Sequence, residues 1–422
     1  MSKFAHMADV HLGAHREPAM QKLELAAFDE ALDRCKELGV DFILISGDLF
    51  HVGIPDLTVV NSALRKMMQI KRAGIQIYAI YGSHDYTPTG TSVIDILDTA
   101  GVIVNLSKWK LEGGKLRLAV HQDERTGTKL AGISARKIGL ESKYYEILDR
   151  KTLEDEEGFK VFAFHSGITE FKPEHLREME TLDISSFPKG FDYYAGGHIH
   201  QRGEFGVKGY EKVVFPGPLF TGYGRDVEDT ARGEKRGFYL VEFDDRIRSV
   251  KFSQVEAFGG IYREYAVGGK NAAEVNAELV QDLASIDVKG KVVVIRIHGE
   301  LAGGRAADID FGTVKKQLDE RGALYIYLNR YSLSSKETSK TFITGEDLSA
   351  IERSLFARGV SKIKVSQQEL SGEKGAAVAT ELLRVFRQGS RSNELKKDYR
   401  QRMVKDGLQT LKLQGISTDA EK

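Results

Sequence analysis

Five short blocks of histidine, aspartate and glycine follow apolar runs in the first 200 residues, and this placement constrains the fold more than any other feature of the chain. The runs Phe42 to Ser46 and Val161 to Phe164 have the length and composition of buried strands. Because the carboxyl ends of parallel strands meet at one edge of a sheet, we expect the five blocks to converge. The blocks are Asp9-Val10-His11, Gly47-Asp48-Leu49-Phe50-His51, Gly82-Ser83-His84-Asp85, His165-Ser166-Gly167 and Gly197-His198-Ile199-His200.

Helical patterns separate these strands. Apolar residues recur at helical spacing over 25–38, and further helices are expected to begin at Asp56 and Ser92, two residues that favour the N-cap position. Over 111–135 and 210–256 the pattern changes to short strands and glycine-containing turns, which indicates a second, more antiparallel sheet. The sequence therefore predicts an α/β fold, a sandwich of two sheets flanked by helices.

The rest of the chain divides by composition. A new strand and helix pattern begins after the sandwich. It is followed by a stretch made nearly all of Ser, Thr and Lys, and the chain then continues as a charged helical tail. We expect a first domain over 1–256, a small α/β domain over 257–330, a linker over 331–344 and a helical C-terminal region over 345–422.

Overall charge and targeting signals exclude several classes of protein. Lys plus Arg and Asp plus Glu are balanced at 61 each, so any contact with nucleic acid must come from a local patch. The single cysteine, Cys35, cannot form an internal disulfide, and the first residues lack the apolar run of a secretory signal. No stretch approaches the ~18 apolar residues of a membrane span. We therefore expect a cytoplasmic protein that does not enter the membrane.

The ligand types in the blocks indicate a metal centre. In an extended segment residues i and i+2 share a face, so Asp9 with His11, and His198 with His200, are expected to point at one site. Mixed imidazole and carboxylate ligands suit Mn²⁺, Fe or Zn²⁺. Two such ions about 3.5 to 4 Å apart can clamp the attacking and leaving oxygens of a phosphate ester, and Asp48 is the expected bridge. The site therefore favours phosphoryl chemistry.

The ordered set D-x-H, G-D, G-N-H-D, H and G-H-x-H resembles the signature of the calcineurin-like metallophosphoesterases. Finer details resemble the nuclease subunit of the double-strand-break repair complex, the meiotic-recombination-eleven family, called SbcD in bacteria, in an archaeal-like form. The resemblance is close over residues 1–250, looser over the small α/β domain, and rests on layout alone in the tail. These details are Gly47-Asp48-Leu49-Phe50-His51, Thr91-Ser92-Val93-Ile94-Asp95-Ile96-Leu97, Gly197-His198-Ile199-His200 and Phe215-Pro216-Gly217.

The resemblance implies the role of each site residue. One Mn²⁺ would be bound by Asp9, His11, Asp48 and His200, and a second by Asp48, Ser83, His165 and His198. His84 would assist the leaving group and His51 would place the substrate phosphate. The implied activity is a Mn²⁺-dependent 3′ to 5′ exonuclease and single-strand endonuclease, and the small α/β domain would be the family's DNA-capping domain.

One position departs from the family pattern. Ser83 stands where the family has Asn. A serine hydroxyl lies closer to the backbone than an amide oxygen and is a poorer neutral ligand, so we expect the second ion to be bound more weakly. Even the loss of a residue that only hydrogen-bonds a metal ligand costs about 10- to 100-fold in metal affinity or activity.

The chain lacks a phosphate-binding loop for ATP, because its Gly-Lys pairs have neither the following Ser or Thr nor the preceding glycine spacing. The resemblance implies that an SMC-like coiled-coil ATPase of the Rad-fifty or SbcC type supplies ATP binding. Two apolar helical stripes in the tail are the predicted docking residues, with burial inside their own domain as the open alternative. The stripes consist of Val378, Leu382 and Val385, and of Leu395, Tyr399 and Met403.

The resemblance also implies a homodimer through helices of the first domain. Leu57, Val59 and Leu97 are candidate apolar surface residues, and the sequence does not assign them to a dimer face. Two other functions remain open at this stage. One is a phosphatase or phosphodiesterase for small molecules on the same scaffold, and the other is a DNA tether whose catalysis is weakened by Ser83.

Overall fold

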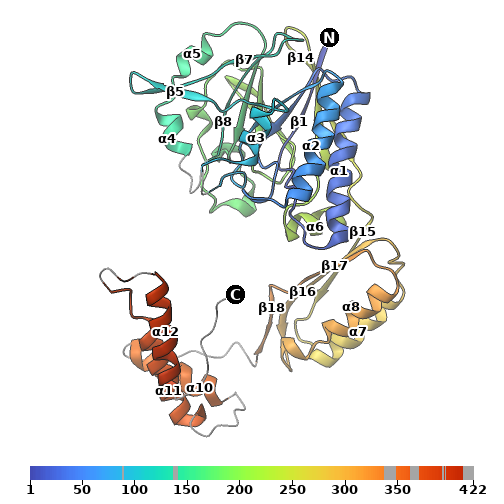
Figure 1. Cartoon of the computed structure of the whole chain (residues 1–422). Coiled ribbons are helices and arrows are strands. Elements are labelled where there is room, and N and C mark those ends of the chain that lie inside the picture. The colour runs from blue at the N-terminus through green and yellow to red at the C-terminus, as the bar shows by residue number, and fades with distance from the viewer. Residues whose placement is uncertain are drawn as a thin grey trace. The chain divides into compact units, whose positions relative to one another are not determined.

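In the computed structural model, shown in Figure 1, the chain divides into two compact units, Met1–Ser335 and Lys336–Lys422. The structure describes residues 1–87, 90–135, 141–336, 348–361, 370–391, 394 and 396–411. Most of the expected linker, 331–344, lies outside these residues, so the division into four parts stays a prediction.

The first unit contains a sheet with the strand order β14-β13-β1-β2-β3-β4. Strands β1 to β4 are parallel, whereas β13 pairs antiparallel with β1, and β14 with β13. The predicted buried strand at 42–46 is confirmed. The bounds are β1 Ser2–Met7, β2 Phe42–Ser46, β3 Gln76–Ile80, β4 Val104–Asn105, β13 Arg236–Phe243 and β14 Ile247–Val255.

A second sheet has the order β11-β12-β10-β9-β8-β7. Strands β8, β9, β10 and β12 are parallel, and antiparallel pairing is limited to the two edges. The second sheet is thus less antiparallel than its glycine-rich turns predict. Its strands are β7 His121–Gln122, β8 Lys129–Ile133, β9 Lys160–His165, β10 Tyr193–Gly197, β11 Gly203–Val207 and β12 Tyr210–Phe215.

The two sheets pack face to face, as predicted. Buried residues of both, including Phe4 and Leu44 from the first and Val161 and Ala195 from the second, form one apolar cluster. Helices α1 (Pro18–Glu37) and α2 (Leu57–Arg72) run side by side along the first sheet (Figure 1). Val59 and Leu97 are buried in the core, so the expectation that they are surface residues is wrong, whereas Leu57 is exposed.

The predicted helix starts are confirmed by their caps. The carboxylate of Asp56 accepts a hydrogen bond from the amide of Thr58 at 2.7 Å. Ser92 and Asp95 form a reciprocal capping box at the start of α3 (Val93–Thr99). The outer side of the second sheet is covered by short elements, which are the hairpin β5 Trp109–Glu112 and β6 Lys115–Leu118, helices α4 Glu141–Glu146 and α5 Arg150–Glu154, and the 3-10 turns η2 Thr169–Phe171, η3 Glu174–Leu176 and η4 Ile184–Ser186.

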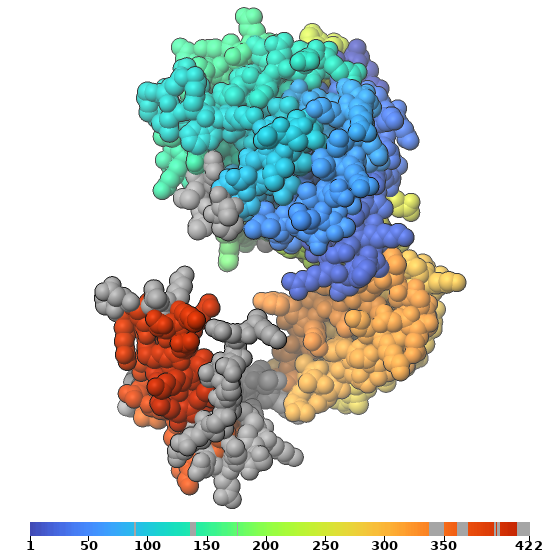
Figure 2. All heavy atoms as spheres, viewed as in Figure 1, coloured from blue at the N-terminus to red at the C-terminus, as the bar shows by residue number. Residues whose placement is uncertain are grey.

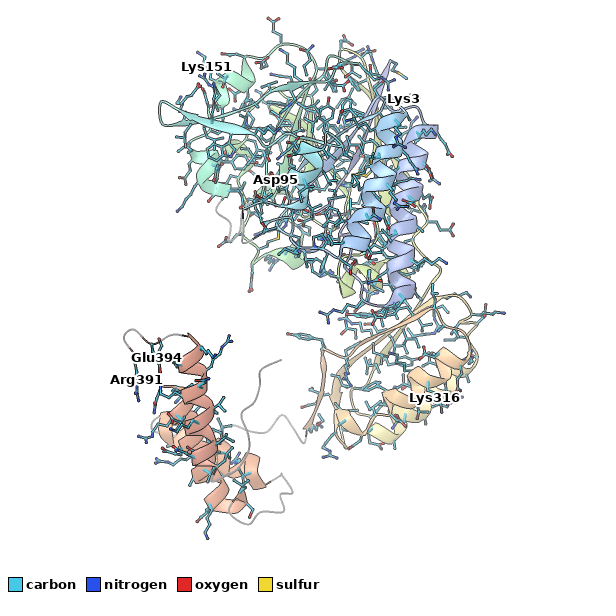
Figure 3. All side chains as sticks on the ribbon, in the orientation of Figure 1. Lys3, Asp95, Lys151, Lys316, Arg391 and Glu394 are labelled. Carbon is cyan, nitrogen blue, oxygen red and sulfur yellow. The ribbon has the colours of Figure 1, made fainter. Side chains whose placement is uncertain are left out.

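A smaller parallel sheet completes the first unit. Its strands are β15 (Gly260–Ala266), β16 (Val292–Leu301), β17 (Tyr325–Asn329) and β18 (Leu333–Ser335). One face of this sheet packs on α7 (Ala272–Ala284) and α8 (Phe311–Glu320). Lys316 of α8 projects away from the sheet (Figure 3). A short 3-10 turn, η5, spans Ala306–Asp308. The opposite side of the sheet contacts α6 (Gly224–Ala231) and shares Val292 and Val294 with the core of the sandwich. In the space-filling view this part of the chain, in orange, lies against the blue N-terminal residues (Figure 2).

The second unit is helical, with α10 (Leu348–Ser361), α11 (Gly372–Phe386) and α12 (Lys396–Thr410). Helix α11 packs against both others. Two residues of the predicted docking stripes, Val385 and Met403, are buried inside this unit. Arg391 and Glu394 lie in the connection between α11 and α12 (Figure 3).

The other docking residues differ in their surroundings. Val378 and Leu382 are half-buried, and the hydroxyl of Tyr399 donates to the carbonyl of Gln388 at 3.0 Å. Leu395 lies outside the described residues. Across the described parts of the chain, none of the helices combines the length and apolar character that crossing a bilayer requires.

Candidate metal centre

The five polar blocks converge at one edge of the sandwich, as predicted. Asp9, Asp48 and Ser83 follow β1, β2 and β3, whereas His165 is the last residue of β9 and His198 comes directly after β10. All of these strands are parallel within their sheets, so their carboxyl ends bring the side chains together.

The backbone around the ligands is not extended. The expectation that residues i and i+2 share a face of an extended segment is therefore wrong, although the side chains do converge. Asp9, His11 and His198 have φ values of 50°, 51° and 83°. The strands have ended, and the chain turns through the left-handed region, which Asp and His tolerate better than most residues. The amide of Asp9 donates to the carbonyl of Gly47 at 3.1 Å, and that of His11 to Asp48 at 2.9 Å. The turns are therefore held by the neighbouring ligand loop.

Two glycines of the blocks allow this close approach. A Cβ atom at Gly47 would overlap the ring of His165, and Gly47 has a φ of 88°. A Cβ atom at Gly82 would overlap the carboxylate of Asp48. Side chains at either position would displace a candidate metal ligand.

One group of candidate ligands consists of Asp9, Asp48 and His165, all buried. Nδ1 of His165 lies 2.8 Å from the carbonyl of Ser46, so the Nδ1–H donates and Nε2 faces the carboxylates. Nε2 is 3.1 Å from Oδ2 of Asp48, yet it makes no hydrogen bond. Burial lowers the pKa of His165, but the charges of Asp48 and Asp9 overcome it and raise the pKa to about 10. The group thus attracts a cation at Nε2.

The second group consists of Asp9, His11 and His200. Nδ1–H of His200 donates to Oδ2 of Asp226 at 2.9 Å, which leaves Nε2 of His200 facing Nε2 of His11 at 3.1 Å. Two imidazole nitrogens at this distance need a cation or a proton between them. Burial opposes the charged form of His200, but the hydrogen bond to Asp226 and the charge of Asp9 raise its pKa.

The two groups share Asp9, and Asp48 also reaches both. Oδ2 of Asp48 is 3.1 Å from Nε2 of His165 and 3.7 Å from Nε2 of His11, while Oδ1 accepts the amide of His84 at 2.8 Å. Buried imidazole and carboxylate groups of this kind suit divalent cations. The residues present therefore fit two such ions.

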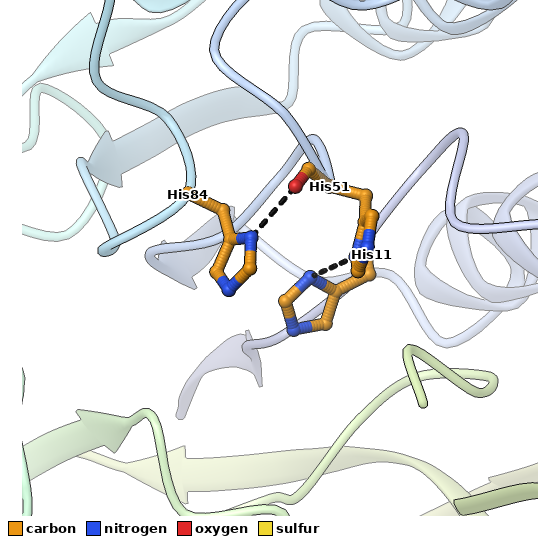
Figure 4. A group of neighbouring side chains, drawn as sticks. All are labelled: His11, His51 and His84. Carbon is orange, nitrogen blue, oxygen red and sulfur yellow. Dashed lines mark hydrogen bonds between the residues drawn. The ribbon is translucent and has the colours of Figure 1, made fainter. Parts of the chain in front are cut away.

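A third cluster, His11, His51 and His84, is a hydrogen-bonded chain (Figure 4). Nδ1–H of His84 donates to the carbonyl of His51 at 2.7 Å, and Nδ1 of His51 lies 3.3 Å from Nδ1 of His11. If His11 uses Nε2 as a ligand, its Nδ1–H donates to His51. The cluster then positions His51 and His84 beside the metal ligands and leaves Nε2 of His84 as the nitrogen available for chemistry.

The remaining predicted ligands lie at the margin of the two groups. The hydroxyl of Ser83 is 3.5 Å from Oδ2 of Asp48. The ring of His198 is 5.2 Å from that of His165, and its backbone amide donates to both oxygens of Asp9 at 2.9 and 3.1 Å. Both residues line the cleft, as do Asp48 and His200 of the ligand groups.

Three residues of the site were not predicted from the sequence. Asp226 and Tyr223 belong to the start of α6, and neither follows an apolar strand or stands at a ligand spacing. The hydroxyl of Tyr223 lies 2.6 Å from Nε2 of His84. Asp85, inside a recognised block, accepts the amides of Phe50 at 3.1 Å and Gly82 at 2.8 Å. Burial and the nearby charge of Asp48 raise the pKa of Asp85 to about 7.

The centre opens into a cleft of about 870 Å³. Its lining includes the apolar residues Leu176 and Met179. The lining also includes Arg225, Arg232 and Arg236 together with Asp226, Asp229 and Glu234, and the side chain of Arg225 is 61% exposed. An anionic chain can reach the ligand groups from this side.

Comparison with known proteins agrees with this geometry. The sequence profile of the calcineurin-like phosphoesterases matches residues 2–202. The DNA double-strand break repair protein Mre11 of Methanococcus maripaludis is 30% identical over 292 residues, which cover 67% of this chain and 74% of that protein. The protein of the same name from Archaeoglobus fulgidus is 23% identical over 75% of this chain and 76% of its own length. The one from Methanopyrus kandleri is 28% identical over 57% and 54%, respectively.

The fold, the buried carboxylate and imidazole groups, and these relatives lead to one assignment. The chain is a metal-dependent phosphodiesterase and belongs to the Mre11 family of DNA double-strand break repair proteins, within the calcineurin-like phosphoesterases.

Proposed function

We propose that the chain is a Mn²⁺-dependent DNA nuclease, with 3′ to 5′ exonuclease and single-strand endonuclease activity, that acts in double-strand-break repair. The observation that carries the proposal is the pair of ligand groups that share the buried Asp9 below an open cleft. Two divalent ions would be held by Asp9, Asp48, His11, His165 and His200, with Ser83 and His198 on the cleft side. Bound there, they would polarise the phosphate and stabilise the attacking and leaving oxygens.

The protein's own residues supply the proton chemistry. Nε2 of His84 is the ring nitrogen not used by the carbonyl of His51, so it can give a proton to the leaving 3′-oxygen. His51 lies beside it, with ring centroids 5.0 Å apart, where it can contact the substrate phosphate. The ring of His84 donates to the carbonyl of His51 and its backbone amide donates to the carboxylate of Asp48, and these two bonds hold His84 beside the ligands.

The test is cleavage of end-labelled duplex and single-stranded DNA by the purified full chain with Mn²⁺, Mg²⁺ or EDTA. We expect cleavage with Mn²⁺ that is lost in His84→Ala. His121→Ala is the matched control, because His121 lies at the far edge of the second sheet and outside the cleft. Cleavage of small phosphodiesters alone, with no action on DNA, would contradict the proposal.

Ser83 favours a second candidate, a DNA tether with weakened catalysis. Its hydroxyl reaches only to 3.5 Å from Asp48, a weak contact for a residue expected to bind the second ion. If the parent protein binds DNA but does not cleave it, and Ser83→Asn cleaves it, the tether is the better description.

We also propose the partners that the family resemblance implies. An SMC-like coiled-coil ATPase would dock on the helical unit of 336–422. Because Val385 and Met403 are buried there, exposed apolar residues such as Phe386 and Val404, 56% and 49% exposed, are better contact candidates. Ile54 and Leu57, 73% and 81% exposed, support a homodimer contact near the start of α2. A cytoplasmic location remains part of this proposal.

A further inference from the structure

The first turn of α6 touches both the metal ligands and the histidine expected to assist the leaving group. It follows a loop after β12 and lies outside residues 2–202, the part of the chain that the phosphoesterase profile matches. Two of its side chains face the centre, Asp226 and Tyr223. The helix also contacts the small parallel sheet and Arg236 of β13, whose side chain donates to the hydroxyl of Thr230 and the carbonyl of Asp226.

Asp226 ties His200 to the backbone of α6. Oδ2 of Asp226 accepts Nδ1–H of His200 and the amides of Gly222 and Tyr223, each at 2.9 Å. The residue is 3% exposed. A buried carboxylate behind a histidine selects the tautomer that presents the other nitrogen to a metal. Asp226 thus determines that Nε2 of His200 faces His11 and Asp9.

Tyr223 holds the ring of His84. Its hydroxyl is 2.6 Å from Nε2 of His84, and its own ring lies 5.3 Å from that of His200 and 5.9 Å from that of His84. A hydroxyl can donate to a neutral imidazole and accept from a protonated one. The contact therefore persists in both states of His84, until a leaving oxygen takes the place of the hydroxyl.

The far side of α6 is fixed by the small sheet. Glu228 is 3% exposed, its Oε2 lies 3.2 Å from Arg296 of β16, and its Oε1 accepts a hydrogen bond from the amide of Asn329 in β17. A Cβ atom at Gly224 would overlap the hydroxyl of Tyr327, so only glycine permits this approach. The helix is thus clamped between the sheet and the metal centre.

We infer that the first turn of α6 is a positioning element in which Asp226 aligns His200 for metal binding and Tyr223 aligns His84 for proton transfer, with Glu228 anchoring both to the small sheet. The inference deepens the proposed function, on which it rests. It names three positioning residues in a segment that carries no metallophosphoesterase block.

The first measurement is a titration of the metal-free full chain with Mn²⁺, in which the electron paramagnetic resonance signal of the free ion reports how much Mn²⁺ remains unbound. Asp226→Asn should weaken one of the two ions about 10- to 100-fold. Glu228→Gln touches no ligand and should weaken the same ion about 2- to 30-fold, the size of remote couplings. The matched control is Asp282→Asn, a carboxylate bound to Tyr265 and Arg263 of β15.

The second measurement separates alignment of His84 from general damage. Tyr223→Phe should lower kcat on DNA about fivefold, which corresponds to the free energy that one hydrogen bond contributes. It should leave unchanged the cleavage of a p-nitrophenyl ester of thymidine 5′-phosphate, because that leaving group needs no proton. In the metal-free protein, the ¹⁵N resonance of Nε2 of His84 should shift in Tyr223→Phe and not in Tyr331→Phe, which alters a fully exposed tyrosine.

The outcomes are distinct. Unchanged Mn²⁺ binding in both Asp226→Asn and Glu228→Gln, or equal losses on both substrates in Tyr223→Phe, would overturn the inference. If Mn²⁺ binding is unchanged in Glu228→Gln but weakened in Asp226→Asn, Glu228 is not a positioning residue and only the roles of Asp226 and Tyr223 remain. If Glu228→Gln does not fold by circular dichroism, Asn329→Ala tests the same contact. A parent protein that binds two Mn²⁺ but leaves DNA intact would contradict the proposed function, while the titration would still test Asp226.

Discussion

The two ligand groups of the centre share Asp9 but are enclosed in different ways. The side chains of His165 and Asp48 are 0% and 2% exposed, whereas that of His200 is 20% exposed. His165 is oriented by a backbone carbonyl at the end of β2, and His200 by the side chain of Asp226 on α6. The first group is thus built by the sheets alone, and the second depends on a separate helix.

This difference indicates how each group can respond to change. A strand end moves only if the sheet moves, so the group of Asp48 and His165 is fixed in advance. The group of His200 opens into the cleft and is held by one carboxylate. We therefore expect changes in the first group to abolish metal binding, and changes around the second to tune it.

The largest effect is expected from His165→Ala. It removes the one imidazole of the buried group and leaves two carboxylates facing each other, so that group should lose its ion. We expect more than the ~100-fold loss that an outer partner of a metal site can cost. Calorimetric Mn²⁺ titration should then report one ion per chain in place of two. His121→Ala serves as control, since His121, on β7, is in none of the ligand groups that the described residues form.

Gly82→Ala should break the same group without removing a ligand. The added methyl overlaps the carboxylate of Asp48, which must move away from His165. Overpacking of this kind costs about 1 to 3 kcal/mol. We expect a loss of Mn²⁺ affinity with a lowered free energy of unfolding in urea. Gly268→Ala, where a Cβ atom meets no neighbour and the backbone is not in the left-handed region, controls for the loss of a glycine. Equal behaviour of the two variants would contradict the close-approach argument.

The contrast between the groups also explains what the sequence could predict. Apolar runs such as Phe42 to Ser46 identify strands, and a ligand that follows a parallel strand is placed by the sheet edge. Asp226 is placed by the packing of α6 between two sheets, which leaves no local pattern. The left-handed backbone at Asp9 and His11 was missed because alternation in a strand says nothing about the turn beyond it. Val59 and Leu97 were misjudged for the same reason, since burial of a helix face depends on what covers it.

Ser83→Asn should strengthen the buried group. An amide oxygen reaches further than the hydroxyl, which lies 3.5 Å from Asp48. If position 83 limits binding of the second ion, the affinity for that ion should rise about tenfold. This is the lower end of the range of about 10- to 100-fold for a residue that supports a metal site. The measurement is the same Mn²⁺ titration, with Ser83→Ala as control. A gain in both variants would show that the hydroxyl hinders the ion, and no gain in either would show that position 83 is not limiting.

The smallest effect on the metals is expected from Glu24→Gln, which instead changes stability with pH. Glu24 of α1 accepts the amides of Gly13 and Ala14, next to His11, and burial raises its pKa from 4.5 to about 7. Because the folded protein binds the proton more tightly, this contribution to stability is complete below pH 4.5 and is lost as the pH rises through 7.

Glutamine cannot ionise, so Glu24→Gln should not show this loss. Between pH 5 and 8.5 the free energy of unfolding of the parent should fall relative to the variant by roughly 2 kcal/mol, given ~1.4 kcal/mol per pKa unit. Urea unfolding at the two pH values measures the difference, and Glu30→Gln, a carboxylate on the same helix that pairs with Arg34, is the control. A parallel pH dependence of parent and Glu24→Gln would mean that the loop after His11 does not depend on the protonated carboxyl, and that the more open ligand group is held by Asp226 alone.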